Sequence, residues 1–254
     1  MALLEVSNIS KVFGGLKALS DVSFTLGRGE IFGVIGPNGA GKTTLFNALT
    51  GLYTPDSGEI RLDGTHLFRR KPHEILKAGL ARTFQNIRLF HDMSALENVM
   101  VGRHARTSSG VLGAVLRSAR TRAEEADSRE RGQALLSRVG IERHSQVLAR
   151  HLAYGDQRRL EIARALATEP KLLALDEPAA GMNSTEKQSL RELLLSLRQD
   201  GLSLMLIEHD VKLVMGTCDR LMVLDYGEKI AEGLPVEIRA NSKVIAAYLG
   251  AEVA

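Results

Sequence analysis

A glycine-rich segment, Gly36-Pro37-Asn38-Gly39-Ala40-Gly41-Lys42-Thr43, constrains this chain most, because it fits the pattern G-x-x-x-x-G-K-S/T. Glu30–Ile35 before it reads as a buried strand, and Thr44–Leu49 after it reads as a helix that ends at Gly51. In that setting backbone N–H groups and a helix N-terminus converge on an anion, whereas an ordinary glycine-rich turn needs neither flanking element. We therefore predict a nucleoside triphosphate site.

The residue types of this loop also suggest how a nucleotide is held. Lys42 has the reach to contact the β- and γ-phosphates, and the hydroxyl of Thr43 is a ligand for Mg²⁺. The predicted phosphate-binding set covers the loop and the first residues of the helix. It comprises Gly36, Pro37, Asn38, Gly39, Ala40, Gly41, Lys42, Thr43 and Thr44.

Length and composition limit the class of protein. The 254 residues, 44% hydrophobic, suffice for one large domain or for a core lobe plus a smaller one. A net charge of +3 is too balanced for nucleic acid to be the principal partner. The single cysteine, Cys218, can form no intrachain disulfide, and the first residues lack the pattern of a signal peptide. The apolar run Val111–Leu116 is among the longest, so we expect a cytosolic chain whose membrane association is peripheral.

The pattern of apolar residues changes along the chain. Strand-like runs at Asp21–Leu26, Glu30–Ile35 and Glu59–Leu62 predict a β-rich edge beside the loop. A helical pattern follows from Ser94 to Val139 and opens with a capping box at Ser94-Ala95-Leu96-Glu97. Strands and helices then alternate, which predicts a parallel sheet with crossover helices. These runs are Lys171–Leu175, Ser184–Arg198, Ser203–Glu208, Val211–Met215 and Arg220–Leu224.

These runs predict an α/β fold of the phosphate-loop NTPase class. A single domain spans residues 1–254, and its nucleotide-binding core with the β-rich edge comprises residues 1–84 and 151–254. A helical subdomain, residues 85–150, is inserted into that core.

Two acidic residues follow a second apolar strand, Leu172-Leu173-Ala174-Leu175-Asp176-Glu177. Ligands of parallel sheets bind at the carboxyl ends of strands, where these carboxylates lie. Asp176 is therefore a candidate Mg²⁺ ligand, and Glu177 a candidate base for the water that attacks the γ-phosphate. The alternative is that both carboxylates belong to a solvated turn without a catalytic role. The phosphate loop earlier in the sequence makes that alternative less favourable.

A third segment places a glycine turn before an amphipathic helix, from Leu152-Ala153-Tyr154-Gly155 to Leu166. Together the motifs resemble the nucleotide-binding subunit of ATP-binding cassette (ABC) transporters over essentially the whole chain. The ordered set is the loop, Gln85, this signature segment, Asp176-Glu177-Pro178 and Glu208-His209-Asp210. Four finer motifs are similar to the bacterial high-affinity branched-chain amino acid importers: Arg82-Thr83-Phe84-Gln85, Leu152-Ala153-Tyr154-Gly155, Asp176–Asn183 and Ala247-Tyr248-Leu249-Gly250.

The resemblance implies further roles. Phe13 stacks on adenine, Gln85 is a catalytic residue that links Mg²⁺ to the membrane partner, and His209 contacts the γ-phosphate and the catalytic water. Ala153, Tyr154 and Gly155 close over ATP held by a second cassette. Judged without the family, Phe13 could instead fill the core, and a histidine at a strand end is more often a structural residue than a catalytic one.

Two positions depart from the general cassette pattern. Ala153 stands where a serine is usual, so backbone N–H groups near Gly155 must replace its hydroxyl, and Tyr154 must point away from the phosphate. Asn183 stands where most cassettes carry an aspartate. It also suits a helix N-cap with Glu186 three residues later, and we leave it out of the catalytic set.

A basic segment spans residues 103–131, with Arg103, Arg106, Arg117, Arg120 and Arg122 followed by mixed charges. The first interpretation of this segment is a solvated helical surface, and the second is contact with a membrane subunit or anionic lipid. Binding of nucleic acid is the last interpretation, because no interleaved aromatic residues are available to stack on bases.

Taken together, the resemblance implies an ATP hydrolase that powers import of branched-chain amino acids. The resemblance further implies that this ATPase works as a homodimer or paired with a homologous cassette. It would lie at the cytoplasmic face of the inner membrane and act on two transmembrane permease subunits. A periplasmic binding protein would take part indirectly. The alternatives are the cassette of a urea or other amino-acid importer, a soluble cassette ATPase that acts on nucleic acid, and a metabolite phosphotransferase.

Overall fold

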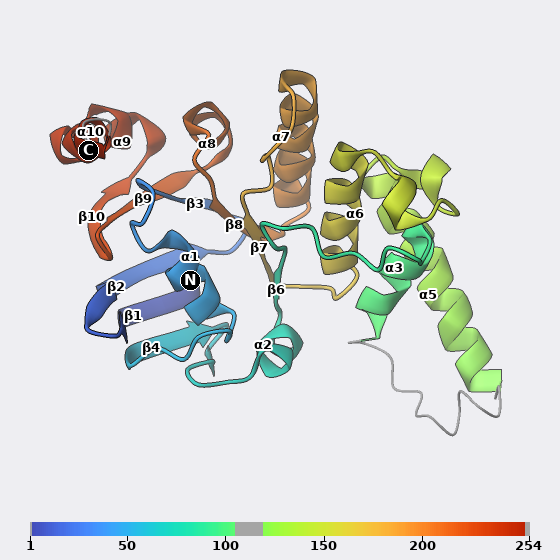
Figure 1. Ribbon diagram of the computed structural model, residues 1–254. Helices are drawn as coiled ribbons and strands as arrows, with labels where there is room; N and C mark the ends of the chain where they lie inside the picture. Colours follow the sequence, from blue (N-terminus) through green and yellow to red (C-terminus); the bar gives the residue numbers. More distant parts are fainter. Residues whose placement is uncertain (1, 105–118, 252–254) are drawn as a thin grey trace. The chain divides into compact units, whose positions relative to one another are not determined.

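The computed structural model describes residues 2–104 and 119–251 (Figure 1). The strands are β1 (Ala2–Phe13), β2 (Leu16–Gly27), β3 (Ile31–Ile35), β4 (Ser57–Leu62), β5 (Thr65–His66), β6 (Leu80–Arg82), β7 (Leu172–Asp176), β8 (Ser203–Ile207), β9 (Arg220–Asp225) and β10 (Glu228–Gly233). The α-helices are α1 (Lys42–Leu49), α2 (Pro72–Ala78), α3 (Ala95–Arg103), α5 (Ala119–Arg138), α6 (Tyr154–Leu166), α7 (Ser184–Gln199), α8 (Val211–Thr217), α9 (Pro235–Ala240) and α10 (Ser242–Ala251). Two short 3-10 helices, η1 (Glu142–His144) and η2 (Ala149–His151), precede α6.

Contacts divide the chain into two compact units. The first comprises Met1–Gln85 and Lys171–Ala254, and the second is Asn86–Pro170. The domain boundaries stated above, which end the helical subdomain at residue 150, stay a prediction. Within the described ranges, no helix combines the length and apolar character that crossing a membrane requires.

The first unit contains two sheets, and the mixed α/β class predicted from the sequence is confirmed. The central sheet has the order β10-β9-β3-β8-β7-β6, in which β3 pairs in parallel with both β8 and β9. Strand β10 pairs antiparallel with β9 at one edge. The second sheet, β2-β1-β4-β5, is antiparallel and forms the β-rich edge (Figure 1).

Several boundaries differ from the sequence-based expectation. Strand β2 begins at Leu16 rather than Asp21, because its pairing with β1 extends to the hairpin. Helix α1 begins at Lys42, two residues before Thr44. Strand β7 runs to Asp176 instead of ending at Leu175, so the first carboxylate is the last strand residue.

Apolar packing fixes the helix that follows the phosphate loop. Leu45 and Phe46 on α1 are fully buried in a core that also contains residues of both sheets. Phe24 of β2 stacks on Phe32 of β3 with ring centroids 5.2 Å apart. Because burial of such side chains stabilises by about 1.5–3 kcal/mol each, α1 is held firmly against the strand that delivers the loop.

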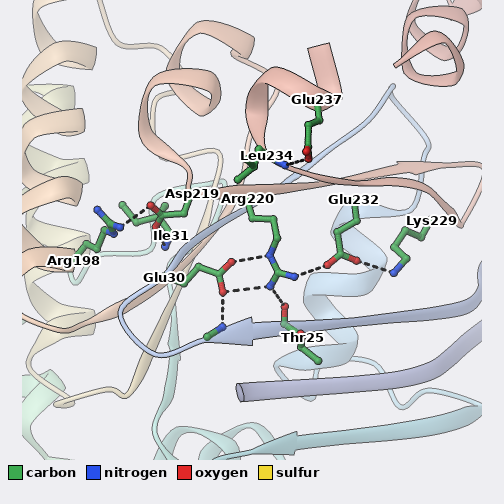
Figure 2. A network of polar contacts seen from close by, with 11 residues as sticks. Thr25, Glu30, Ile31, Arg198, Asp219, Arg220, Lys229, Glu232, Leu234 and Glu237 are labelled. Carbon is green, nitrogen blue, oxygen red and sulfur yellow. Dashed lines mark hydrogen bonds and ion pairs between the residues drawn. The ribbon is translucent and has the colours of Figure 1, made fainter. Parts of the chain in front are cut away.

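A polar network joins the strands at the end of the central sheet opposite the loop (Figure 2). Its centre is Arg220, whose guanidinium donates to Glu30 Oε1 at 2.9 Å, to Glu232 Oε1 at 2.8 Å and to the Thr25 carbonyl at 2.6 Å. Glu30 also accepts from the backbone N–H of Gly27. One side chain thereby ties β2, the start of β3, β9 and β10 together.

The second unit is helical, and α3 packs against both α5 and α6. Ser94 caps α3 through the expected box: its Oγ accepts from the Glu97 N–H at 3.2 Å. Arg103 is buried and pairs with Glu169 at 2.5 Å and with Asp127 at 3.2 Å. The expectation that Arg103 belongs to a solvated surface is therefore wrong, because it links the end of α3 to α5 and to the turn after α6.

The rest of the basic segment is less informative. Arg122 is exposed, whereas Arg106, Arg117 and the side chain of Arg120 lie outside the described residues. The apolar run Val111–Leu116 also lies outside them.

Candidate functional site

The phosphate loop turns sharply between β3 and α1, and two of its glycines are required by close contacts. Gly36 has φ 152°, and a Cβ there would lie 2.1 Å from the Leu224 carbonyl oxygen. Gly41, the N-cap of α1, has φ 100°, and its Cβ would lie 2.6 Å from the Ala18 oxygen. Neither position accepts a side chain without rearrangement of the backbone. Gly41 offers no capping side chain, so the first N–H groups of α1 are available to an anion.

Lys42 lies inside the loop rather than in solvent. It is 8% exposed, and its Nζ donates to the carbonyl oxygens of Gly36 at 2.7 Å and Pro37 at 2.8 Å. Burial lowers the pKa of this ammonium, and the negative charges of Glu177 and Asp176 oppose the shift. The buried cation therefore lies within electrostatic range of both carboxylates predicted to act on the phosphates and water.

Glu177 is held at the centre of the predicted catalytic residues. Its Oε2 accepts from Gln85 Nε2 at 2.9 Å and lies 3.7 Å from His209 Nδ1. Its backbone has φ 46°, a left-handed conformation that is uncommon outside glycine, and its N–H donates to the Ile207 carbonyl at 2.9 Å. The structure thus brings together Gln85, Glu177 and His209, which come from three distant parts of the sequence.

His209 is 62% exposed at its side chain. The His209 side chain is therefore accessible to solvent and not part of the core. The residue before it, Glu208, is buried and accepts from the backbone N–H groups of Ala179 at 2.8 Å and His209 at 3.2 Å. Burial raises the pKa of Glu208, and these N–H groups oppose the rise. Glu208 thereby fixes both the turn after Glu177 and the backbone of His209.

Asp176 is buried at the end of β7, 3.7 Å from Arg82 Nη2. Arg82 also donates to Asn47 Oδ1 at 2.9 Å and to Thr50 Oγ1 at 2.7 Å. Its guanidinium lies 4.5 Å from the ring centroid of Phe46, so it is oriented from several sides. Sequence analysis did not identify Arg82 or Glu208 as site residues. Nothing in a lone arginine or a strand-end glutamate distinguishes them, since their partners are distant in the chain.

Three further candidates of the first unit, Thr43, Thr44 and Phe13, are partly or fully exposed. Thr43 is exposed on the first turn of α1, and Thr44 is half-buried. Phe13 ends β1 and is 42% exposed, with its ring centroid 5.3 Å from that of Tyr53 in an edge-to-face contact. Core filling is therefore excluded as the role of Phe13, and an aromatic face is presented to solvent.

The signature segment belongs to the second unit. Ala153 is the N-cap of α6 and Gly155 is the second residue of the helix, so the expected glycine turn before the helix is wrong. Tyr154 folds back along α6, where its hydroxyl accepts from Arg158 Nη2 at 3.0 Å. Asp156 of the same turn lies 3.2 Å from His144 Nδ1. The side chains thus bend toward their own unit, and backbone N–H groups remain at the start of α6.

Asn183 has the structural role considered as the alternative to catalysis. Its Oδ1 accepts from the Glu186 N–H at 3.0 Å, and its own N–H donates to Glu186 Oε2 at 2.9 Å. This reciprocal box begins α7, as predicted.

Comparisons with known proteins agree with this geometry. A family model described as ABC transporter matches residues 19–180, and one described as branched-chain amino acid ATP-binding cassette transporter matches residues 228–254. The high-affinity branched-chain amino acid transport ATP-binding protein LivG of Salmonella typhimurium is 46% identical over 98% of both chains. The protein of the same description from Pseudomonas aeruginosa, BraF, is 44% identical over 98% of both chains.

Solved structures show the same fold. A nucleotide-free ATP-binding cassette from an ABC transporter superposes with a TM-score of 0.85 and 30% identity, covering 98% of this chain and 99% of its own. A dimeric cassette in a post-hydrolysis state bound to ADP and Pi gives a TM-score of 0.77 and 26% identity, over 91% of this chain and 98% of its own. The phosphate loop, the carboxylate pair at the end of β7 and these relatives lead to one conclusion: the chain belongs to the ATP-binding cassette ATPases of ABC transporters.

Proposed function

We propose that this chain is the ATP-hydrolysing subunit of an importer of branched-chain amino acids. The relatives named above are ATP-binding proteins of such transport systems, and they match along nearly their whole length. The second family model, which covers β10 and the C-terminal helices, carries the same description. A urea or other amino-acid importer is the alternative, because the cassette itself does not contain the site that selects the transported molecule.

The observation that carries the proposed chemistry is the position of the Glu177 carboxylate. Gln85 and His209 contact it from two sides, and its charge acts on Lys42 in the phosphate loop. A carboxylate next to a phosphate-binding cation is suited to take a proton from the water that attacks the γ-phosphate. His209 then orients that water and contacts the γ-phosphate, while Lys42 binds the β- and γ-phosphates.

The residues present fit a magnesium ion. Thr43, Gln85 and Asp176 offer a hydroxyl, an amide oxygen and a carboxylate, which are the hard oxygen ligands that Mg²⁺ prefers. Asp176 is buried at the end of β7, and Thr43 is exposed beside the loop. When bound, Mg²⁺ supplies positive charge to the β- and γ-phosphate oxygens.

The nucleotide site is completed at both of its ends. The exposed ring of Phe13 stacks on adenine, and backbone N–H groups of residues 38–44 bind the phosphates. Ala153, Tyr154 and Gly155 of a second cassette close the site through backbone N–H groups, because Tyr154 is engaged by Arg158. Two cassettes, identical or homologous, therefore form the working ATPase.

The cassettes work on two permease subunits at the cytoplasmic face of the membrane. A periplasmic binding protein delivers the substrate to those subunits and contacts the cassettes only through them. We expect Gln85, whose amide donates to Glu177 Oε2 at 2.9 Å, to couple the membrane partner to hydrolysis.

The test is purification of the assembled transporter from membranes with a tag on this chain, followed by ATPase assays. We expect two permease proteins to copurify, and we expect leucine, isoleucine or valine, added with the cognate binding protein, to stimulate hydrolysis. Stimulation of hydrolysis by urea and not by these amino acids would instead assign urea as the transported molecule. A chain recovered without any membrane protein would refute the transporter role.

A further inference from the structure

Strand β6 ends beside the carboxylate pair of β7. The two strands pair in parallel as far as Arg82 and Ala174. The contact continues beyond β6, because the Thr83 N–H donates to the Ala174 carbonyl at 3.0 Å and Thr83 Oγ1 accepts from the Asp176 N–H at 3.3 Å. The backbone of Asp176 is therefore fixed by the segment that leads to Gln85.

The side chain of Arg82 approaches the Asp176 carboxylate. Its Nη2 lies 3.7 Å from Asp176 Oδ2, and the two side chains are only 12% and 5% exposed. Because little solvent screens these charges, the attraction between them is stronger than that of a surface pair. The guanidinium thereby sets the direction in which the carboxylate points.

The guanidinium of Arg82 is itself held in place, mainly by α1. Its Nη1 donates to Asn47 Oδ1 at 2.9 Å and to Thr50 Oγ1 at 2.7 Å. Its central carbon lies 4.5 Å from the ring centroid of Phe46, which is fully buried, and 4.4 Å from that of Phe84. Helix α1, which follows the phosphate loop, and one aromatic ring of the 82–85 segment thus determine where this positive charge lies.

The same short segment contacts both acidic residues of the site. Arg82 pairs with Asp176, and Gln85 Nε2 donates to Glu177 Oε2 at 2.9 Å. Phe84, which contacts the guanidinium, directly precedes Gln85. Residues 82–85 therefore align the candidate metal ligand with the candidate base.

We propose that Arg82 is a positioning residue of the magnesium site: its guanidinium holds the Asp176 carboxylate in the orientation in which it receives Mg²⁺ together with ATP. Carboxylates that bind metal ions are oriented by such outer partners, and loss of one partner typically costs about 10- to 100-fold in metal affinity. Arg82 acts through Asp176. The inference rests on the proposed ATP and magnesium site, and it is independent of which molecule is transported.

The test compares Arg82→Lys with Arg220→Lys in the full-length chain. Lysine keeps the positive charge but lacks the planar fork that reaches several partners at once and lies against aromatic rings. Arg220 is the matched control, since its guanidinium also lies over a phenylalanine ring, 5.1 Å from the Phe32 centroid. It also pairs with a carboxylate, Glu30, at the end of the sheet opposite the loop (Figure 2).

Calorimetry measures the affinity for a non-hydrolysable ATP analogue, once with excess Mg²⁺ and once with EDTA. Thermal unfolding in EDTA reports the stability of the metal-free chain. We expect Arg82→Lys to weaken binding about 10-fold with Mg²⁺ and to leave the affinity in EDTA unchanged. Arg220→Lys should match the wild type in both conditions. In an Asp176→Asn background, Arg82→Lys should weaken binding no further, because both substitutions act on the same carboxylate.

Equal affinity of Arg82→Lys and the wild type with Mg²⁺ would overturn the inference, as would the same loss in Arg220→Lys or an additive loss in the double variant. A similar loss in EDTA with a lowered melting temperature would also overturn it, because that combination indicates a purely structural role. A wild-type chain that bound the analogue no more tightly with Mg²⁺ than with EDTA would refute the proposed magnesium site. A wild-type chain that bound no nucleotide would refute the proposed function itself.

Discussion

Replacement of Glu177 by glutamine separates nucleotide binding from hydrolysis. Glu177 Oε2 accepts from Gln85 Nε2 at 2.9 Å, and glutamine retains a side-chain oxygen that can accept this bond. The bond changes from a charged to a neutral acceptor, which weakens it by about half, or about 1 kcal/mol. Loss of a general base, in contrast, slows the chemical step by about 10²- to 10⁴-fold, or about 3–5 kcal/mol. The second effect is larger, so we expect nearly normal ATP affinity and very slow turnover.

The assay measures ATP binding and single-turnover hydrolysis on the same preparation of the assembled transporter. Glu192→Gln is the matched control, because Glu192 Oε1 also accepts from a glutamine amide, Gln188 Nε2 at 2.8 Å, on the exposed side of α7. The control should hydrolyse ATP as the wild type does. Near-normal hydrolysis by Glu177→Gln would show that another group activates the water, and His209, 3.7 Å away, would be tested next.

Three further variants test the loop and the fold. Lys42→Ala removes the charge held by two loop carbonyls and should weaken ATP binding itself by at least tenfold in calorimetry, whereas equal affinity would refute its role. Gly36→Ala would place a Cβ 2.1 Å from the Leu224 oxygen and should lower the free energy of unfolding by about 2–4 kcal/mol. Gly39→Ala is the control and should lower it much less, because a Cβ at Gly39 meets nothing within 4 Å. Asp210 has a lowered pKa, chiefly because a lysine of α7 donates to it. Its stabilisation is therefore present above the unfolded-state pKa of about 3.9 and lost as pH falls through the folded value. Asp210→Asn, which preserves the helix cap, should lower the free energy of unfolding by about 0.5–1 kcal/mol at neutral pH. Chemical unfolding should show that difference starting to decline below about pH 4 and vanishing once the pH lies below the folded pKa of Asp210.

Local sequence signals predicted those parts of the fold that depend on neighbours in the chain. The capping boxes at Ser94 and Asn183 formed as expected, because both partners lie within one turn. The uninterrupted apolar runs of β3 and β8 became fully buried central strands. Strand β1, in contrast, was not predicted, since its pairing with β2 is broken by several register shifts and Asn8 has φ 51°. These irregularities remove the period of two that identifies a strand.

As with the fold, the parts of the candidate site that could be predicted are those that a local residue pattern indicates. The phosphate loop was recognised because its glycines occupy positions with positive φ where other residues do not fit. The contact between Gln85 and Glu177 joins residues 92 positions apart, and no local pattern indicates it. Arg82 was not identified as a site residue because its importance depends on a tertiary neighbour, Asp176. Family resemblance supplied the roles of Gln85 and His209, which residue type alone left open.

The Arg220 network has a consequence for the order in which this protein is made. Arg220 and Glu30 are 190 positions apart, and β3 lies between β8 and β9, which are synthesised late. At about 5–20 residues per second, β3 waits roughly 10–40 s on the ribosome before its partners emerge. During that interval its edges are unpaired, and it is a natural target for chaperones. The phosphate loop is therefore among the first motifs to be translated and among the last to become able to bind ATP.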